Sequence, residues 1–313
     1  MATLRDIRRR IKAIQSMAKI TKAMQMVSIS KMKRAQQAAL LGIPYADMLN
    51  EILTQATQHA GAYQHGLMEN RNGTRKLIIL VGTDRGLCGS LNSNIFREVA
   101  KYDRDTTLFV TIGAKAAQFV QKTGRLLIVD FNYSDQPKLS EARMVGRFVT
   151  QLFMDDEIDS ADIVFSDYVS TFKQVPLTWR FLPAGQSQEF FDLMPESLKR
   201  TKIAEMQKGG NDNIVEFEFE PTVNTVCESL LLRSLDYQLL QIMREVRASE
   251  HSARMVSMKQ ATDNARDMNS ALQLVHNNLR QASITKELLL QRNLTNSATI
   301  TGRTLHKRAL QAV

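Results

Sequence analysis

The longest hydrophobic pattern in the chain runs from about Pro221 to Leu290 with the spacing of an α-helix. No proline or glycine interrupts it after Pro221. A helix of this length extends roughly 100 Å at about 1.5 Å per residue, which is too long for a compact domain. The apolar positions recur in steps of three, four and seven, at Leu235, Leu239, Ile242, Val246, Ala253 and Val256, and then at Met258, Ala261, Ala265, Met268, Leu272, Val275, Leu279 and Ala282.

A second helical pattern begins the chain, and Thr3 with Asp6 forms a weak capping box in front of it. Either stripe alone would leave a large apolar surface in water, so we expect the two helices to pair as a long antiparallel two-helix coiled coil. A helix lying on the core of its own domain is the alternative. The N-terminal stripe has the alternating three and four spacing of a coiled-coil seam, at Leu4, Ile7, Ile11, Ile14 and Ala18.

The middle of the chain has a different period, with short apolar runs separated by helical segments. Alternating strands and helices predict a small, mostly parallel sheet covered by helices, that is, a central Rossmann-like α/β domain. The predicted strands are 76–81, 107–112, 126–131, 162–165, 175–181 and 214–219, and the predicted helices are 92–102, 114–122 and 140–155.

These patterns divide the chain into four parts. We expect an N-terminal coiled-coil helix over residues 1–60, the central α/β domain over 61–212, a C-terminal coiled-coil helix over 213–290, and a tail over 291–313. The fold class is therefore α+β or α/β with a coiled coil.

The formal charge of +9 is concentrated at the N-terminus, where residues 1–46 carry ten bases and one acid, Asp6. Such a helix suits an acidic partner, a nucleic acid or a membrane face. The two cysteines, Cys88 and Cys227, lie far apart, so neither a metal-ligand spacing nor a redox pair is present and an intracellular protein is expected. No apolar run reaches the 18 or more residues of a membrane span, and we expect no direct transmembrane segment.

One glycine-rich stretch, from Gly82 to Asn92, follows a predicted strand and opens a helix. Backbone amides at a helix N-terminus can hold a phosphate. The spacing fits neither GxGxxG nor GxxxxGK[ST], so a structural turn is the preferred interpretation and no cofactor is expected. No carboxylate pair, metal cluster or nucleophile arrangement is found elsewhere, and we expect no catalytic or metal-binding residues.

Three stretches resemble the gamma subunit of the F-type ATP synthase, the central rotor stalk. They are RIKAIQSMAKITKAMQMVSISKMKRAQ from Arg10 to Gln36, GTDRGLCGSLNSN from Gly82 to Asn94, and SEHSARMVSMKQATDNARDMNSALQLVHNNLRQASITKEL from Ser249 to Leu288. With the segments between them, they cover nearly the whole chain to Leu288. The sequence departs from the family after Glu287, because residues 289–313 contain no acid and are unlike the usual family ending.

The resemblance implies a rotor shaft that couples ion flow through the membrane sector to conformational cycling of the catalytic beta subunits, and hence to ATP synthesis or hydrolysis. The expected partners are three alpha and three beta subunits, the epsilon subunit and the c-subunit ring. Such a shaft is not catalytic by itself, and it is peripheral on the cytoplasmic face of the bacterial inner membrane.

The resemblance also assigns residues to subunit interfaces, and the alternative for each of them is an ordinary solvated residue of a long helix. These are Lys19, Lys22, Met24, Lys31, Lys33, Arg254, Gln281 and Thr285. The expected coiled-coil seam comprises Leu4, Ile7, Ile11, Ile14, Leu235, Ile242, Met268, Leu272, Val275 and Leu279.

A basic coiled coil that binds nucleic acid is the alternative function. It would explain the cationic N-terminal helix and would show an affinity that falls steeply with salt. The basic region has no interleaved aromatic residue before Tyr45, and the C-terminal rod is balanced in charge. We therefore expect no nucleic-acid partner.

Overall fold

The computed structural model describes residues 3–42, 44–46, 48–49, 52–53, 56, 65–71, 73–184, 220 and 222–310, with side chains described as far as residue 292. The predicted strand 214–219 lies outside the described residues. The chain divides into two compact units, Met1–Ala23 with Met258–Val313, and Met24–Ser257. The two long helices contribute residues to both units, and each unit is described by itself.

Two long helices form at the ends of the chain, as the sequence predicted. Helix α1 is Leu4–Leu40 and helix α8 is Val223–Leu310. The Thr3 hydroxyl accepts a hydrogen bond from the Asp6 N–H at 3.2 Å, and the Asp6 carboxylate accepts one from the Thr3 N–H at 3.1 Å, so the N-terminus of α1 is capped reciprocally. Helix α8 continues through most of the predicted tail.

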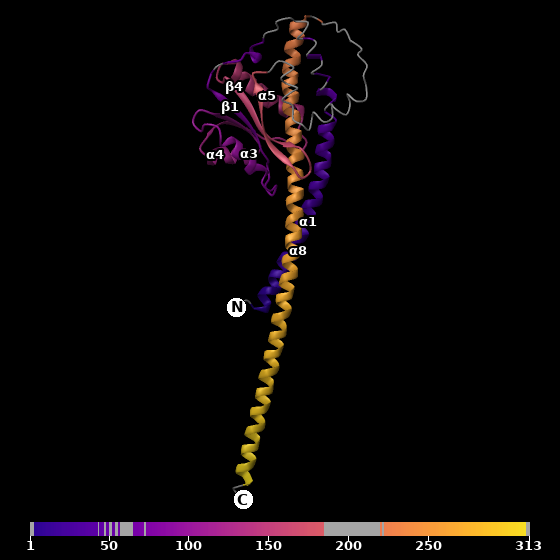
Figure 1. The fold of residues 1–313 in the computed structure, drawn as a ribbon, viewed down its shortest axis with the longest axis vertical. Helices are drawn as coiled ribbons and strands as arrows, with labels where there is room; N and C mark the ends of the chain where they lie inside the picture. The colour runs from indigo at the N-terminus through magenta and orange to yellow at the C-terminus, as the bar shows by residue number, and fades with distance from the viewer. Residues whose placement is uncertain are drawn as a thin grey trace. The chain divides into compact units, whose positions relative to one another are not determined.

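In the first unit, the least exposed positions of both helices follow a heptad spacing. The hydroxyls of Thr21 and Thr262 are 2.8 Å apart and join the two helices. The helices run antiparallel (Figure 1), so steps of seven place Ile14 level with Asn269, and Ile7 level with His276. On α1 these positions are Leu4, Ile7, Ile11, Ile14, Ala18 and Thr21; on α8 they are Met258, Thr262, Ala265, Asn269, Leu272, His276 and Leu279.

The sequence placed Met268 and Val275 in this seam, and that prediction is wrong. Their side chains are 56% and 43% exposed, whereas their neighbours Asn269 and His276 are half-buried. Polar residues occupy these seam positions, so following only apolar residues shifts the stripe by one residue. Leu272 and Leu279 belong to both the predicted and the observed stripe.

The second unit is built around a five-stranded sheet with the order β3-β2-β1-β4-β5. Strands β1 to β4 are parallel and β5 pairs antiparallel with β4 at one edge, which confirms the predicted small, mostly parallel sheet. The strands are β1 Lys76–Val81, β2 Leu108–Ile112, β3 Leu126–Phe131, β4 Ser160–Tyr168 and β5 Gln174–Leu182; the helices between them are α3 Leu91–Val99, α4 Ala114–Lys122 and α5 Leu139–Met154, and a short 3-10 helix, η1, covers Gly66–Met68.

Helices cover both faces of the sheet (Figure 1). Strand β1 is buried on both sides, which explains its unbroken apolar sequence. On one face, α3 and α4 pack on Ile78, Leu80 and Phe109. On the other face, α5 and the Leu231–Val246 part of α8 pack on Ile79 and its neighbours in a larger core. Helix α8 is therefore part of the core of the α/β domain in this unit.

Within the part of the chain that the structure describes, no helix combines the length and the apolar character that crossing a bilayer requires. Among these described residues, no group of three or more His, Cys, Asp or Glu side chains is placed to hold a metal ion.

Two phenylalanines offer a matched test of this core. Phe165 in β4 is fully buried in the larger core, whereas Phe172 is 78% exposed. We expect Phe165→Ala to lower the free energy of unfolding by about 3–5 kcal/mol, since it removes buried apolar surface and leaves a cavity. Phe172→Ala should change it by less than about 0.5 kcal/mol. Urea unfolding followed by circular dichroism measures both, and equal effects would contradict the described packing.

Candidate functional site

A cluster of charged residues with a buried centre lies in the second unit where α8 passes the carboxyl ends of the parallel strands. Its centre is Arg247, whose side chain is 3% exposed, beside Glu250, which is also 3% exposed. Three segments that are distant in sequence meet there: the turn after β1, the loop after β3 and one face of α8. We call this cluster the ionic joint; its members are Asp84, Tyr133, Asp135, Arg247, Glu250, His251 and Arg254.

The Arg247 guanidinium makes bonds to each of these three segments. Its Nη2 donates to the Asp84 carboxylate at 2.6 Å and to the Tyr133 carbonyl at 2.8 Å. Its Nε donates to the Ser134 carbonyl at 3.2 Å, and its Nη1 donates to Glu250 Oε2 at 2.7 Å. The guanidinium carbon also lies 3.7 Å from the centre of the Tyr133 ring. This fixed fork of donors therefore sets the rotation of α8 about its own axis against the sheet.

Glu250 links Arg247 to a second arginine on the next turn of α8. Its Oε1 accepts from Arg254 Nη2 at 2.6 Å. Arg254 also donates to the carbonyls of Arg85 and Gly86, at 3.3 Å each. The two arginines share Glu250, and Asp84 supplies the second negative charge, so each buried guanidinium has a carboxylate partner, as burial of charge requires.

The glycine-rich turn that the sequence singled out is the surface against which these arginines bind. Asn92 Nδ2 donates to the Thr83 hydroxyl at 2.8 Å, and that hydroxyl donates to the Arg85 carbonyl at 2.9 Å. The turn also needs a left-handed backbone at Gly89, with φ of 61°. Burial raises the pKa of the Cys88 thiol, which keeps this thiol protonated. The turn thus presents carbonyl acceptors to α8, as a structural turn does.

Helix α1 joins the same cluster through Lys31, whose ammonium forms an ion pair with Asp135 in the loop after β3. His251 Nε2 lies 3.7 Å from the same carboxylate. Further along α1, Gln36 Nε2 donates to the Tyr168 hydroxyl. The two helices and the sheet of this unit are therefore tied together by polar contacts at successive levels.

The end of α1 is capped by side chains of α8. Tyr237 donates to the Gly42 carbonyl at 2.7 Å, Gln241 to Ala39 at 3.2 Å, and Arg244 to Ala38 at 3.3 Å. The last carbonyls of a helix have no partners inside the helix, so these donors satisfy groups that would otherwise be unpaired. Their spacing of four and three places them on one face of α8, in a stretch where the sequence predicts only an apolar stripe.

Burial changes the acid–base behaviour of two residues on this part of α8. Burial lowers the pKa of His251 to about 4, so its imidazole is neutral at pH 7. Burial and the nearby Asp167 raise the pKa of Glu245 to about 8, so its carboxyl is largely protonated at pH 7. For Arg247, burial opposes the charged form, but Tyr133, Glu250 and Asp84 outweigh it and raise the pKa.

The structure separates the residues that were assigned to subunit interfaces. In the first unit, Lys19, Gln281 and Thr285 are exposed and Lys22 is half-buried. In the second unit, Lys33 is exposed, Met24 is half-buried, Lys31 pairs with Asp135, and Arg254 is only 8% exposed. Arg254 is thus a member of the ionic joint and is not presented to a partner, because Glu250 and the turn after β1 use its donors.

Of the remaining predicted seam residues, Leu235 and Ile242 lie in the second unit. Both are buried, at 2% and 6% exposure, in the core that α8 shares with the sheet. In this unit they therefore contribute to the hydrophobic core of the α/β domain.

Removal of Glu250 tests the ionic joint. Glu250→Ala leaves Arg247 and Arg254 without their shared carboxylate, so we expect the free energy of unfolding to fall by about 3–5 kcal/mol. The matched control is Asp263→Ala, which removes an exposed carboxylate 3.7 Å from Arg266. Asp263→Ala should lower the free energy of unfolding by less than about 1 kcal/mol. Chemical unfolding measures both variants, and a Glu250→Ala protein as stable as the control would contradict the joint.

A dependence of stability on pH follows from the buried histidine. The pKa of His251 is about 4 in the folded chain and 6.5 in the unfolded chain, so the unfolded chain binds more protons between these values. The free energy of unfolding should therefore fall as the pH falls from 7 to 4, by about 3 kcal/mol from this group. Protonation of Glu245 in the folded chain raises the stability over part of the same pH range, which opposes the effect of His251. Both the wild type and the His251→Gln variant contain Glu245, so the difference between their pH profiles reports on His251. A variant that loses stability in parallel with the wild type would refute the assignment.

Comparison with known proteins agrees with this architecture. A family profile described as ATP synthase matches residues 3–289. The ATP synthase gamma chain of Methylacidiphilum infernorum is 38% identical over 294 residues, covering 92% of this chain and 97% of the relative. That of Opitutus terrae is 36% identical over 293 residues, covering 92% and 96%.

Solved structures with the same fold include two components of mitochondrial ATP synthases. The rotor of the Euglena gracilis enzyme matches with a TM-score of 0.58 and 17% identity, covering 90% of this chain and 98% of the other. The central stalk and c-ring structure from Tetrahymena thermophila matches with a TM-score of 0.57 and 20% identity, covering 77% and 99%. Since the family profile spans most of the sequence and the relatives match it over nearly their full length, the chain belongs to the family of ATP synthase gamma chains.

Proposed function

We propose that the chain is the central rotor shaft of an F-type ATP synthase. It couples ion flow through the membrane sector to conformational cycling of the catalytic beta subunits, and hence to ATP synthesis or hydrolysis. The observation that carries this proposal is the ionic joint, in a chain that belongs to the gamma family. A shaft has to transmit torque without its helices slipping on the attached domain, and Arg247 bonds both to the turn after β1 and to the loop after β3.

The proposed mechanism is mechanical and electrostatic, with the chemistry of ATP synthesis carried out by the beta subunits. A rotor changes which beta conformation is favoured at each angle through a difference in contact free energy, which requires an asymmetric surface. Helix α1 supplies such asymmetry, because cations and apolar side chains share its outer surface. Met17, Ile20, Met26 and Val27 are each more than half exposed. Exposed apolar residues beside cations suit a partner with an acidic and partly apolar face.

The proposed partners are three alpha and three beta subunits, the epsilon subunit and the c-subunit ring. Residues 1–60 and 213–290 would form the shaft and residues 61–212 the attached domain, while residues 291–313 would be an atypical tail. The residues that would meet the beta subunits are Lys19, Lys22, Met24, Lys31, Lys33, Gln281 and Thr285. Lys31 would do so while paired with Asp135, since its side chain is 40% exposed. The assembly would be peripheral on the cytoplasmic face of the bacterial inner membrane.

A tagged copy of the full chain tests the assembly. Purified from membranes of its own host, it should bring down alpha and beta subunits in a ratio of one chain to three of each. Quantitative mass spectrometry of the purified complex measures the ratio. Recovery of nucleic acid in place of these subunits would support the alternative function and overturn the proposal.

The coiled-coil seam provides a test of coupling in the same complex. Leu272→Asp places a charge in the seam of the first unit, and we expect ATP synthesis driven by an imposed ion gradient to fall at least tenfold. The matched control is Leu274→Asp, because Leu274 is 65% exposed. The Leu274→Asp complex should retain most of the rate of ATP synthesis if the pairing of the two helices depends on the seam and not on the outer surface of α8. Unchanged synthesis in the Leu272→Asp complex would show that the pairing of the helices is not needed for coupling.

A further inference from the structure

The sheet of the second unit carries a pocket on the side away from α8. It lies where α3 and α4 end, on the face opposite the larger core, and has a volume of about 740 Å³. This volume is in the range of pockets that hold small molecules. Nine residues line it: Ser93, Phe96, Arg97, Ala100, Arg104, Phe119, Lys122, Thr123 and Arg125.

The lining is strongly basic, with four cations and no carboxylate. Arg97 and Lys122 are exposed and, among the described residues, have no ion-pair partner. Arg104 and Arg125 are held in place by the chain, since Arg104 Nε donates to the Gly124 carbonyl at 3.3 Å and Arg125 Nη1 to the Tyr102 carbonyl at 3.1 Å. Arg104 and Arg125 are thus held in position, whereas the side chains of Arg97 and Lys122 are able to adapt to a ligand.

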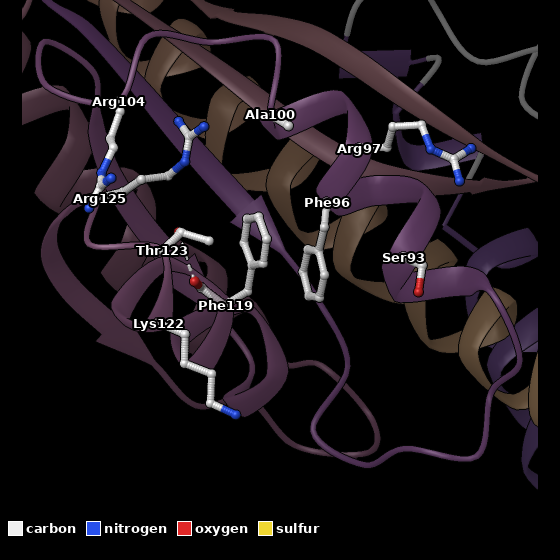
Figure 2. A pocket seen from close by; sticks show the side chains of 9 residues that line it. All are labelled: Ser93, Phe96, Arg97, Ala100, Arg104, Phe119, Lys122, Thr123 and Arg125. Carbon is white, nitrogen blue, oxygen red and sulfur yellow. Dashed lines mark hydrogen bonds between the residues drawn. The ribbon is translucent and has the colours of Figure 1, made fainter.

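Two aromatic rings form an apolar wall of the pocket. Phe96 and Phe119 are stacked, with ring centres 4.1 Å apart and ring planes inclined by 3°. Figure 2 shows the two rings facing one another, with Arg104 and Arg125 together on one side of them. The Ser93 hydroxyl also lines the pocket. Charge, a hydroxyl donor and an apolar wall are therefore combined in one hollow.

A structural role explains the cations only in part. Arg97 and Lys122 lie in the last turns of α3 and α4, where a positive charge is favourable next to the helix dipole. That effect needs one cation at each helix end and no common cavity. It does not account for the two further cations, Arg104 and Arg125, which lie together on one side of the aromatic pair (Figure 2), or for a lining that has no acid.

We propose that this pocket binds a phosphorylated anion, and that its cations and aromatic wall recognise a polyphosphate or a phosphate-bearing headgroup. The four cations are spread around the hollow (Figure 2), so they are matched by several negative charges, which linked or multiply charged phosphate groups supply and a single carboxylate does not. The planar guanidinium fork of arginine suits phosphate oxygens. The site is independent of the ionic joint and of the shaft function, because it lies on the other face of the sheet.

The test measures binding of phosphate probes to the full chain by isothermal titration calorimetry at low salt. The probes are inorganic pyrophosphate and tripolyphosphate, and vesicles of phosphatidylglycerol with phosphatidylcholine vesicles as the neutral comparison. The pocket variant is Arg97→Gln with Lys122→Gln. The control is Arg147→Gln with Lys173→Gln, which removes two exposed cations that do not line the pocket. Circular dichroism confirms that both variants are folded.

We expect saturable binding that the pocket variant weakens at least tenfold and the control leaves within twofold. Binding of the soluble probes would identify a free polyphosphate as the ligand source, whereas binding of phosphatidylglycerol vesicles alone would identify a lipid headgroup. Either result supports the proposal. It is overturned if no phosphate probe binds, or if the pocket variant weakens binding no more than the control variant does.

Discussion

The second unit of this protein depends on one buried arginine. Arg247 is almost fully removed from water, and leaving it unpaired would cost several kcal/mol. Its four hydrogen bonds go to two loops and to its own helix. Apolar packing alone tolerates small rotations and shifts of a helix, whereas these bonds have fixed directions. The joint therefore specifies a single orientation of α8 on the sheet, which suits a part that has to turn with its attached domain.

Polar residues have a similar role between the paired helices of the first unit. Thr21 and Thr262 bond to one another in the seam, and Asn269 and His276 occupy later seam positions. The Oδ1 atom of Asn269 is buried without a hydrogen-bond partner among the described residues. Polar groups at seam positions lower the stability of a coiled coil but fix its register. Such a seam is marginal in apolar content, and exposed apolar side chains such as Met17 and Ile20 remain for other contacts.

The α/β domain supports different chemistry on its two faces. The face toward α5 and α8 buries apolar side chains and ends in the ionic joint, so its charges are satisfied within the chain. The opposite face ends in the pocket between α3 and α4, where Arg97 and Lys122 remain exposed. Because α8 covers only the first of these faces, the cations of the second face are available to a ligand without disturbing the joint.

The sequence by itself determined the elements of this fold. Strands such as Lys76–Val81 and helices such as Ala114–Lys122 were predicted within a residue or two, because period and composition are local properties. It also identified the turn from Gly82 to Asn92 as a distinct feature, although not its partners. The family resemblance reached the same architecture from its motifs, and the comparisons confirm the family.

Only the tertiary structure decided how charged residues are used. Arg254 looked like a contact for another subunit, but it lies within bonding distance of Glu250, Arg85 and Gly86. Met268 and Val275 looked like seam residues, but the seam passes through Asn269 and His276. The physical reason is that a hydrophobic pattern in the sequence predicts which side chains are buried but not which polar groups they meet. A buried ion pair is stable only through partners that are distant in sequence. The identity of those partners is a property of the folded chain.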